Sequence, residues 1–182
     1  MTDDIAVLAN PTAGRGRHRG LLPAVLDRLG TTGRTVRLLD ATTAEEAEKA
    51  CHRAVDEGVS ALVAVGGDGT VHQALQAVAG REVGFGVVPA GTGNDFAAGV
   101  GVPLAPNAAA DAIAAAVRDG RDHRVDLARI SGTDGEVRWF GAVLAAGFDA
   151  IVNERANRMR WPRGPRRYDV AIALEMARLR AR

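Results

Sequence analysis

The sequence predicts an α/β fold in which two layers of helices enclose a parallel sheet. Short apolar runs such as Ile5–Ala9 and Ala61–Val65 are continuous, as in strands that are buried on both faces. Longer segments with helical periodicity separate these runs, and glycine-rich loops follow three of them. Such alternation is typical of parallel strands joined by right-handed crossovers through helices.

The elements of the first half can be assigned in chain order. The predicted strands are Ile5–Ala9, Thr35–Leu39, Ala61–Val65 and Phe85–Val88. The predicted helices are Leu21–Leu29, Thr43–Asp56, Thr70–Ala79 and Ala108–Arg118. Thr43 and Glu46 have the spacing of a capping box, and a glycine follows the first, second and fourth helices as a stop signal.

The pattern changes after Asp122, where we place a domain boundary. Arg124–Ile130 and Glu136–Ala145 flank a turn at residues 131–135, which predicts an antiparallel hairpin. Tyr168–Arg180 is predicted as a helix with an apolar stripe that includes Val170, Leu174 and Ala177. We therefore expect a domain at 1–122 and, at 123–182, the incomplete beginning of an antiparallel, β-rich second domain. Because so few strands bury little surface, we expect further strands beyond Arg182.

Composition limits the classes of partner. The formal net charge of +1 gives no overall attraction to nucleic acid, and none is predicted as a partner. From Arg155 onward there are nine arginines against two acidic residues, a basic end that fits either an anionic membrane or an ordinary solvated face. The acidic N-terminus differs from a signal peptide, so a cytoplasmic protein is expected. The lone Cys51 reads as a small buried hydrophobe.

Three loops carry the predicted chemistry: Asn10-Pro-Thr-Ala-Gly14, Gly66-Gly-Asp-Gly-Thr70 and Gly91-Thr-Gly-Asn-Asp95. Each follows a predicted strand, so all three should meet at the carboxyl edge of the sheet, where open α/β folds bind ligands. Glycine permits positive φ and close approach, and helix N-termini attract phosphate oxygens. The sequences match neither a P-loop nor a dinucleotide fingerprint.

Individual residues in these loops also have structural interpretations. Gly66 and Gly67 could simply turn the chain before a helix that Thr70 caps, and Asn94 could cap a short helix that begins at Asp95. Asp68 is different, because a carboxylate beside phosphates would repel them unless a cation intervenes. It therefore predicts a water-mediated Mg²⁺ site.

The three motifs, in this order, resemble the diacylglycerol kinase catalytic-domain family in its bacterial lipid-kinase branch, which includes sphingosine kinase-like proteins. The motif at 66–70 also resembles NAD kinases and phosphofructokinases. The resemblance implies a three-layer, phosphofructokinase-like or Rossmann-like nucleotide-binding domain followed by a β-rich domain. It further implies transfer of the γ-phosphate of ATP to a lipid hydroxyl with Mg²⁺, in the cleft between the domains.

Carried over by position, the family's nucleotide contacts fall on Asn10, Pro11, Thr12, Ala13, Gly14, Thr42, Gly66, Gly67, Asp68, Gly69, Thr70, Val71, His72, Thr92, Gly93 and Asn94. Thr43 is an equal alternative to Thr42. The family's base belongs to a downstream Asp-Gly-Glu motif, so we expect it beyond Arg182. Asp134-Gly-Glu136 has those letters but reads as a hairpin turn, and Asp68 and Asp95 are weaker catalytic candidates.

Three functions follow from these features. The leading one is an ATP-dependent lipid kinase in a truncated form, acting on a diacylglycerol-like alcohol. The others are a nucleotide-binding module without catalysis and a phosphotransferase similar to NAD kinase. Expected partners are ATP, the lipid and the inner face of an anionic membrane, which the protein would contact peripherally. Exposed edge strands also predict a homodimer.

Overall fold

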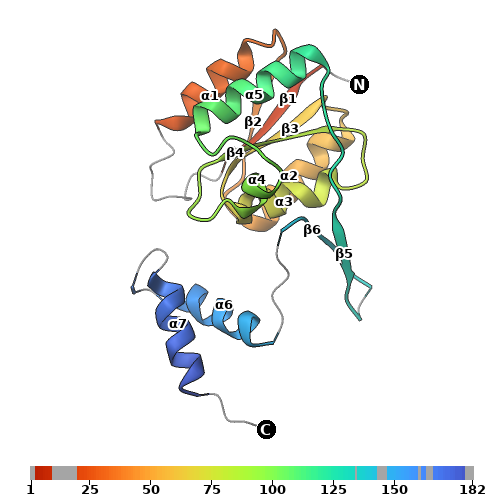
Figure 1. Cartoon of the computed structure of the whole chain (residues 1–182). Coiled ribbons are helices and arrows are strands. Elements are labelled where there is room, and N and C mark those ends of the chain that lie inside the picture. Colours follow the sequence, from red (N-terminus) through yellow and green to blue (C-terminus); the bar gives the residue numbers. More distant parts are fainter. Residues whose placement is uncertain are drawn as a thin grey trace. The chain divides into compact units, whose positions relative to one another are not determined.

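The structure is a computed structural model that describes residues 3–9, 20–133, 135–142, 147–159, 161–162 and 166–178 (Figure 1). The chain divides into two compact units, Met1–Ala142 and Val143–Arg182. The first unit contains two clusters of buried hydrophobic residues, and the second contains a smaller one of its own.

A parallel sheet forms the centre of the first unit. Its strands are β1 (Ile5–Ala9), β2 (Val36–Leu39), β3 (Ala61–Gly66) and β4 (Gly84–Pro89). The order across the sheet is β2-β1-β3-β4, and every neighbouring pair is parallel. All residues of β3, one of the two inner strands, are buried, as its continuous apolar run predicted. Because the strands are parallel, their carboxyl ends lie at one edge.

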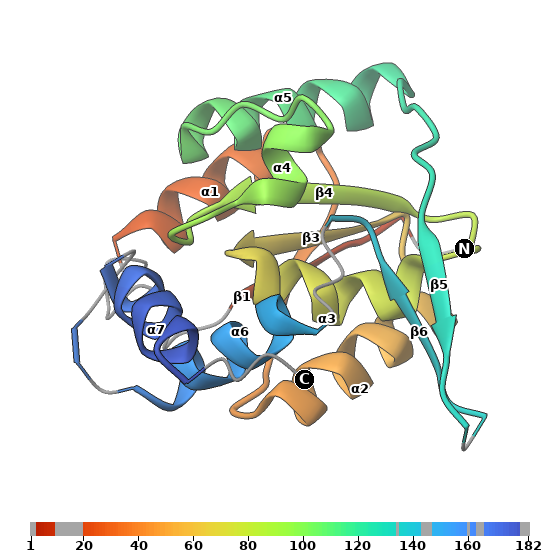
Figure 2. The same cartoon turned by 60° about the horizontal axis from the view of Figure 1, so that its bottom comes forward.

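Helices cover both faces of this sheet, which confirms the predicted three-layer α/β fold (Figures 1 and 2). One face carries α1 (Leu21–Gly30) and α5 (Pro106–Asp119), and the other carries α2 (Ala44–Asp56) and α3 (Asp68–Val78). Alternate strand residues divide between the two layers. Val7 belongs to the cluster beneath α1 and α5, whereas Leu8 belongs to the cluster beneath α2 and α3.

The start of α3 differs from its predicted position at Thr70. Gly67 is the residue that precedes the helix, and its carbonyl accepts from the amides of Thr70 at 2.9 Å and Val71 at 3.1 Å. Thr70 is therefore inside the first turn, with 5% of its surface exposed, and does not cap the helix. The earlier start places Asp68 in that first turn, where a negative charge is favourable.

A two-stranded antiparallel hairpin follows the layered domain. It consists of β5 (Ala128–Ser131) and β6 (Val137–Phe140), which confirms the predicted hairpin with shorter strands. In the turn, the Gly132 amide donates to the Glu136 carbonyl at 2.8 Å, and Gly135 has a φ of 82° that glycine adopts without strain.

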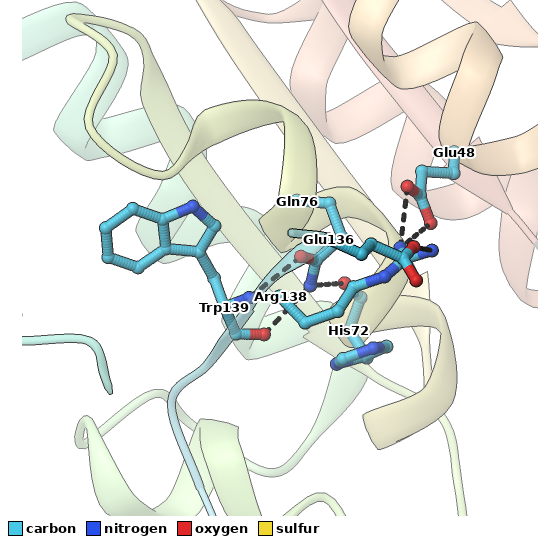
Figure 3. Close-up of polar contacts among 6 residues, drawn as sticks. All are labelled: Glu48, His72, Gln76, Glu136, Arg138 and Trp139. Atoms are coloured by element: carbon cyan, nitrogen blue, oxygen red, sulfur yellow. Dashed lines mark hydrogen bonds and ion pairs between the residues drawn. The ribbon is translucent and has the colours of Figure 1, made fainter. Parts of the chain in front are cut away.

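The hairpin is bonded to the helices of the first unit (Figure 3). The buried side chain of Gln76 on α3 donates to the Trp139 carbonyl and accepts from the Trp139 amide, both at 2.9 Å. Arg138 donates to the carboxylate of Glu48 on α2 at 2.7 and 2.8 Å. These contacts join the hairpin to the first compact unit, which extends to Ala142, and the domain boundary at Asp122 stays a prediction.

The second unit consists, in its described residues, of α6 (Phe148–Arg158) and α7 (Arg166–Met176). They pack through Val152, Ala156 and Ala171, with an ion pair between Arg155 and Glu175. The apolar stripe predicted for the last helix is wrong: Ala171 faces the partner helix, and Leu174 on the predicted stripe is exposed. Across the described residues, no helix has the length and apolar character needed to cross a membrane.

Candidate functional site

A pocket of about 370 Å³ lies at the carboxyl edge of the parallel sheet. Its walls come from the end of β1, the segment that enters α2, the start of α3 and the loop after β4. The lining residues are Leu8, Ala9, Ala41, Thr42, Thr43, Ala44, Ala47, Gly67, Gly69, Thr70, Gln73 and Gly91. The size is within the range of small-molecule sites. Because Gly67, Gly69 and Thr70 belong to one predicted loop and Gly91 belongs to another, two of the three predicted loops converge on one cavity.

The backbones of the two glycine-rich loops, at 66–70 and 91–95, are in close contact at Gly67 and Gly91. A β-carbon on Gly91 would overlap the Cα of Gly67, and a β-carbon on Gly67 would lie 3.0 Å from the Cα of Gly91. The expectation that these glycines provide positive φ is wrong for Gly67, which has a φ of −96°. Close approach is what requires glycine here. Gly66 is constrained in a similar way, because a β-carbon there would overlap the side chain of Thr70.

The carboxylate of Asp68 bridges the same two loops. Its Oδ2 accepts from the Asn94 amide at 2.8 Å and its Oδ1 accepts from the Phe96 amide at 3.1 Å. Gly93 lies against this carboxylate, since a β-carbon there would be 2.9 Å from Oδ2. Asp68 does not line the pocket.

A metal site is not evident from the side chains that the structure describes. Within those ranges, no group of three His, Cys, Asp or Glu residues could hold a metal ion. Both oxygens of Asp68 already accept backbone hydrogen bonds. The described residues therefore do not by themselves form a protein-held Mg²⁺ site, and the site predicted at Asp68 stays a prediction.

Asn94 occupies the junction between the loop and the short helix α4 (Asp95–Gly99). It has a left-handed φ of 65°, a conformation that asparagine tolerates better than most residues. Its side chain turns back to Gly91, accepting from that amide at 2.9 Å and donating to that carbonyl at 3.3 Å. The interpretation of Asn94 as a side-chain cap of α4 is therefore wrong. Asp68, in the first turn of α3, supplies the hydrogen-bond acceptors for this helix start.

Thr42 and Thr43 both border the pocket but make different contacts. Thr43 Oγ accepts from the Glu46 amide at 3.1 Å, and the Glu46 carboxylate accepts from the Thr43 amide at 3.2 Å, which confirms the capping box. The same carboxylate accepts from the Thr42 hydroxyl at 2.6 Å. The pKa of Glu46 is lowered below its ordinary value. The largest cause is this hydroxyl bond, and the backbone bonds from Thr42 and Thr43 contribute less. Thr43 is thus the cap, and the hydroxyl of Thr42, which also lines the pocket, is bonded to Glu46.

The remaining predicted residues lie outside the pocket wall. The Val71 side chain is buried in the core beneath α2 and α3. His72, Thr92, Gly93 and Asp95 are exposed, and none of them lines the pocket. Asn10–Gly14 and Asp134 lie outside the described residues.

Sequence reasoning missed several lining residues. Gln73 lies one turn after Thr70 on α3, and that three-residue spacing could have indicated a shared face. Gly91 stands in a quoted motif, but its place in the wall depends on its contact with Gly67. The small apolar residues Ala41, Ala44 and Ala47 carry no chemical signal that a sequence could reveal.

The layered fold and the pocket at the strand ends define an α/β protein with a loop-built pocket. The chain belongs to the diacylglycerol kinase catalytic domain family, whose model matches residues 4–130.

Similar proteins agree with this assignment. A diacylglycerol kinase from Mycobacterium tuberculosis (strain CDC 1551 / Oshkosh) is 42% identical over 177 residues, which cover 97% of this chain and 56% of the relative. A YegS-like lipid kinase from Stenotrophomonas maltophilia (strain K279a) is 37% identical over 113 residues, 59% of this chain and 35% of the relative. A crystal structure of a diacylglycerol kinase from Bacillus anthracis str. Sterne matches with a TM-score of 0.56 and 28% identity, over 62% of this chain and 42% of the other. The chain thus spans about half the length of its M. tuberculosis relative.

Proposed function

We propose that this chain forms the nucleotide-binding part of an ATP-dependent lipid kinase, which transfers the γ-phosphate of ATP to the hydroxyl of a diacylglycerol-like lipid. The observation that carries the proposal is the pocket at the carboxyl edge of the sheet. Gly67, Gly69 and Gly91 line it with backbone atoms that no side chain covers. The family of the chain supports the same reaction class.

In this proposal the phosphates of ATP lie at the start of α3. The first amides of a helix have no acceptor inside the helix, and the helix dipole favours negative charge there. Gly69 leaves room for phosphate, since a β-carbon on it would meet nothing within 4 Å. Thr42 or Thr43, which also line the pocket, would contact ATP. The predicted contacts at Asn10–Gly14 and at Thr92 remain part of the proposal.

We include Mg²⁺ as the ion that accompanies ATP and reduces the charge of its phosphates. We propose that the residue that activates the lipid hydroxyl lies in the part of the relatives that this chain does not match. Asp68 and Asp95 are the weaker alternatives within the chain. Asp68 is engaged by loop amides, and Asp95 lies exposed at the first turn of α4.

The second unit is the proposed membrane contact. Its helices expose Ile151, Tyr168 and Met176, and the segment between them exposes Trp161. The same part of the chain, from Arg155 onward, carries nine arginines and two acidic residues. Aromatic and aliphatic side chains beside arginines suit the surface of an anionic membrane. We place this peripheral contact on the cytoplasmic side, where ATP is available.

Vesicle co-sedimentation tests the contact. The protein should sediment with phosphatidylglycerol vesicles and remain free with phosphatidylcholine vesicles. Charge reversal of Arg166 and Arg167, both in the described part of α7, should release it. Equal binding to both vesicle types would contradict an electrostatic contact. The predicted homodimer is tested separately by light scattering during gel filtration.

The proposed activity is tested with purified protein, ATP, Mg²⁺ and dispersed diacylglycerol. Formation of phosphatidic acid supports the kinase. Binding of ATP without phospholipid product favours a nucleotide-binding module. Phosphorylation of NAD would contradict the lipid kinase and favour a phosphotransferase similar to NAD kinase. Gly69→Val should reduce ATP affinity by filling open space at the wall. Gly30→Val, at the end of α1 and also without neighbours within 4 Å, is the matched control.

A further inference from the structure

The acidic residue of the Gly-Gly-Asp-Gly-Thr motif makes contacts that differ from those of a metal ligand. Each oxygen of Asp68 accepts one backbone amide of the loop after β4, at 2.8 Å from Asn94 and 3.1 Å from Phe96. Hydrogen bonds to an ionised carboxylate are stronger than those between neutral groups. The side chain therefore spans two segments that are distant in the sequence, the start of α3 and the start of α4.

The loop depends on this carboxylate for its shape. The amides at the start of a helix lack intrahelical acceptors, and the Asn94 side chain does not supply one for α4. Asn94 instead bonds to both backbone groups of Gly91. Asp68 fixes the amide of Asn94, and the Asn94 side chain fixes Gly91, which lines the pocket.

The fit between the loops is tight. Gly93 leaves no room for a side chain against Oδ2 of Asp68, and Gly91 leaves none against Gly67. A shift of the loop would therefore change the wall of the pocket directly. If the carboxylate turned toward a cation, the amides of Asn94 and Phe96 would lose their acceptor, and Phe96 belongs to the buried core.

We propose that Asp68 is a positioning residue, which holds the loop at 91–96 against the start of α3 and acts on the nucleotide through Gly91, without coordinating Mg²⁺. The inference deepens the proposed nucleotide site and rests on it. It replaces the water-mediated metal site that the sequence predicted for this carboxylate. Its consequence is that the contribution of Asp68 to nucleotide affinity does not depend on the metal.

The test compares Asp68→Asn with the parent chain. Asparagine keeps the shape and one acceptor, but its amide group would face a backbone donor. Dissociation constants are measured for ATP with Mg²⁺ and for ATP with EDTA. We expect affinity to fall by roughly tenfold in both conditions, the loss of one charge-assisted hydrogen bond. Asp122→Asn removes the same charge at an exposed position away from the pocket and should match the parent.

Hydrogen exchange provides a readout that does not need nucleotide. In Asp68→Asn, the amides of Asn94 and Phe96 should exchange roughly tenfold faster, while those of α1 keep the parent rate. A loss of affinity confined to the Mg²⁺ condition, with unchanged exchange, would overturn the proposal and make Asp68 a metal contact. If the parent bound no ATP, the proposed function would fail, and the exchange rates would still decide whether Asp68 holds the loop.

Discussion

Replacing Gln76 by leucine should release the β5–β6 hairpin from α3. The Gln76 side chain bonds both backbone groups of Trp139 and also donates to the carbonyl of His72 at 2.9 Å, one turn earlier on the same helix (Figure 3). Leucine has a similar size but neither donor nor acceptor. The amide and carbonyl of Trp139 would then lie against an apolar side chain.

The expected loss follows from these contacts. A buried backbone group without a partner costs about 1 to 3 kcal/mol, and Trp139 is half-buried, so we take about 1 to 1.5 kcal/mol for each of its two groups. Burial of the apolar leucine side chain offsets roughly 1 kcal/mol of this cost. The free energy of unfolding should therefore fall by about 1 to 2 kcal/mol. Glu48→Gln, which weakens the more exposed ion pair with Arg138, should cost less than about 1 kcal/mol.

The assay uses a Trp161→Phe background, so that fluorescence reports Trp139 alone. The exposed Trp161 lies in the second unit, and its replacement should not disturb the hairpin. Urea unfolding is followed by Trp139 emission and by circular dichroism, together with hydrogen exchange at Trp139. Should Gln76→Leu keep the parent's midpoint, emission and exchange, the hairpin would be held by something other than Gln76.

Three further predictions concern the rest of the first unit. Gly91→Ala should destabilise the fold by about 1 to 3 kcal/mol in urea, because its β-carbon would overlap Gly67; an unchanged midpoint would contradict the close approach. The lowered pKa of Glu46 means that its bonds stabilise the fold above the ordinary glutamate pKa and are lost as pH falls through the lowered value. Glu46→Ala should therefore melt below the parent at pH 7 but not at pH 2. Burial raises the pKa of the Cys51 thiol to about 12, so thiol reagents should label it only after unfolding; rapid labelling of the native protein would contradict its burial.

The sequence predicted the layered domain well because its signals are local. The continuous apolar run at Ala61–Val65 can only be buried on both faces, and the structure buries it so. The capping box at Thr43 and Glu46 was predictable for the same reason, since both partners lie within one turn.

The contacts that connect distant segments were not predictable. The motif around Asp68 does not indicate that the carboxylate oxygens of Asp68 accept from the amides of Asn94 and Phe96. That pairing depends on how two segments distant in the sequence meet in space. α6 was missed since its sequence, which includes two asparagines and two arginines, has only two buried residues, Val152 and Ala156. The polar Gln76 was missed as a link to the hairpin because its partner is backbone, which has no signature in the sequence.

The bond between Gln76 and Trp139 also decides where the hairpin's sheet can grow. Both backbone groups of Trp139 point away from Arg129, its neighbour on β5, toward the side where a third strand would pair. A helix side chain occupies that position and closes this side of β6. All residues of β5 are exposed. A strand added to this hairpin, from any source, would therefore have to join along β5, so the small sheet can be extended in one direction.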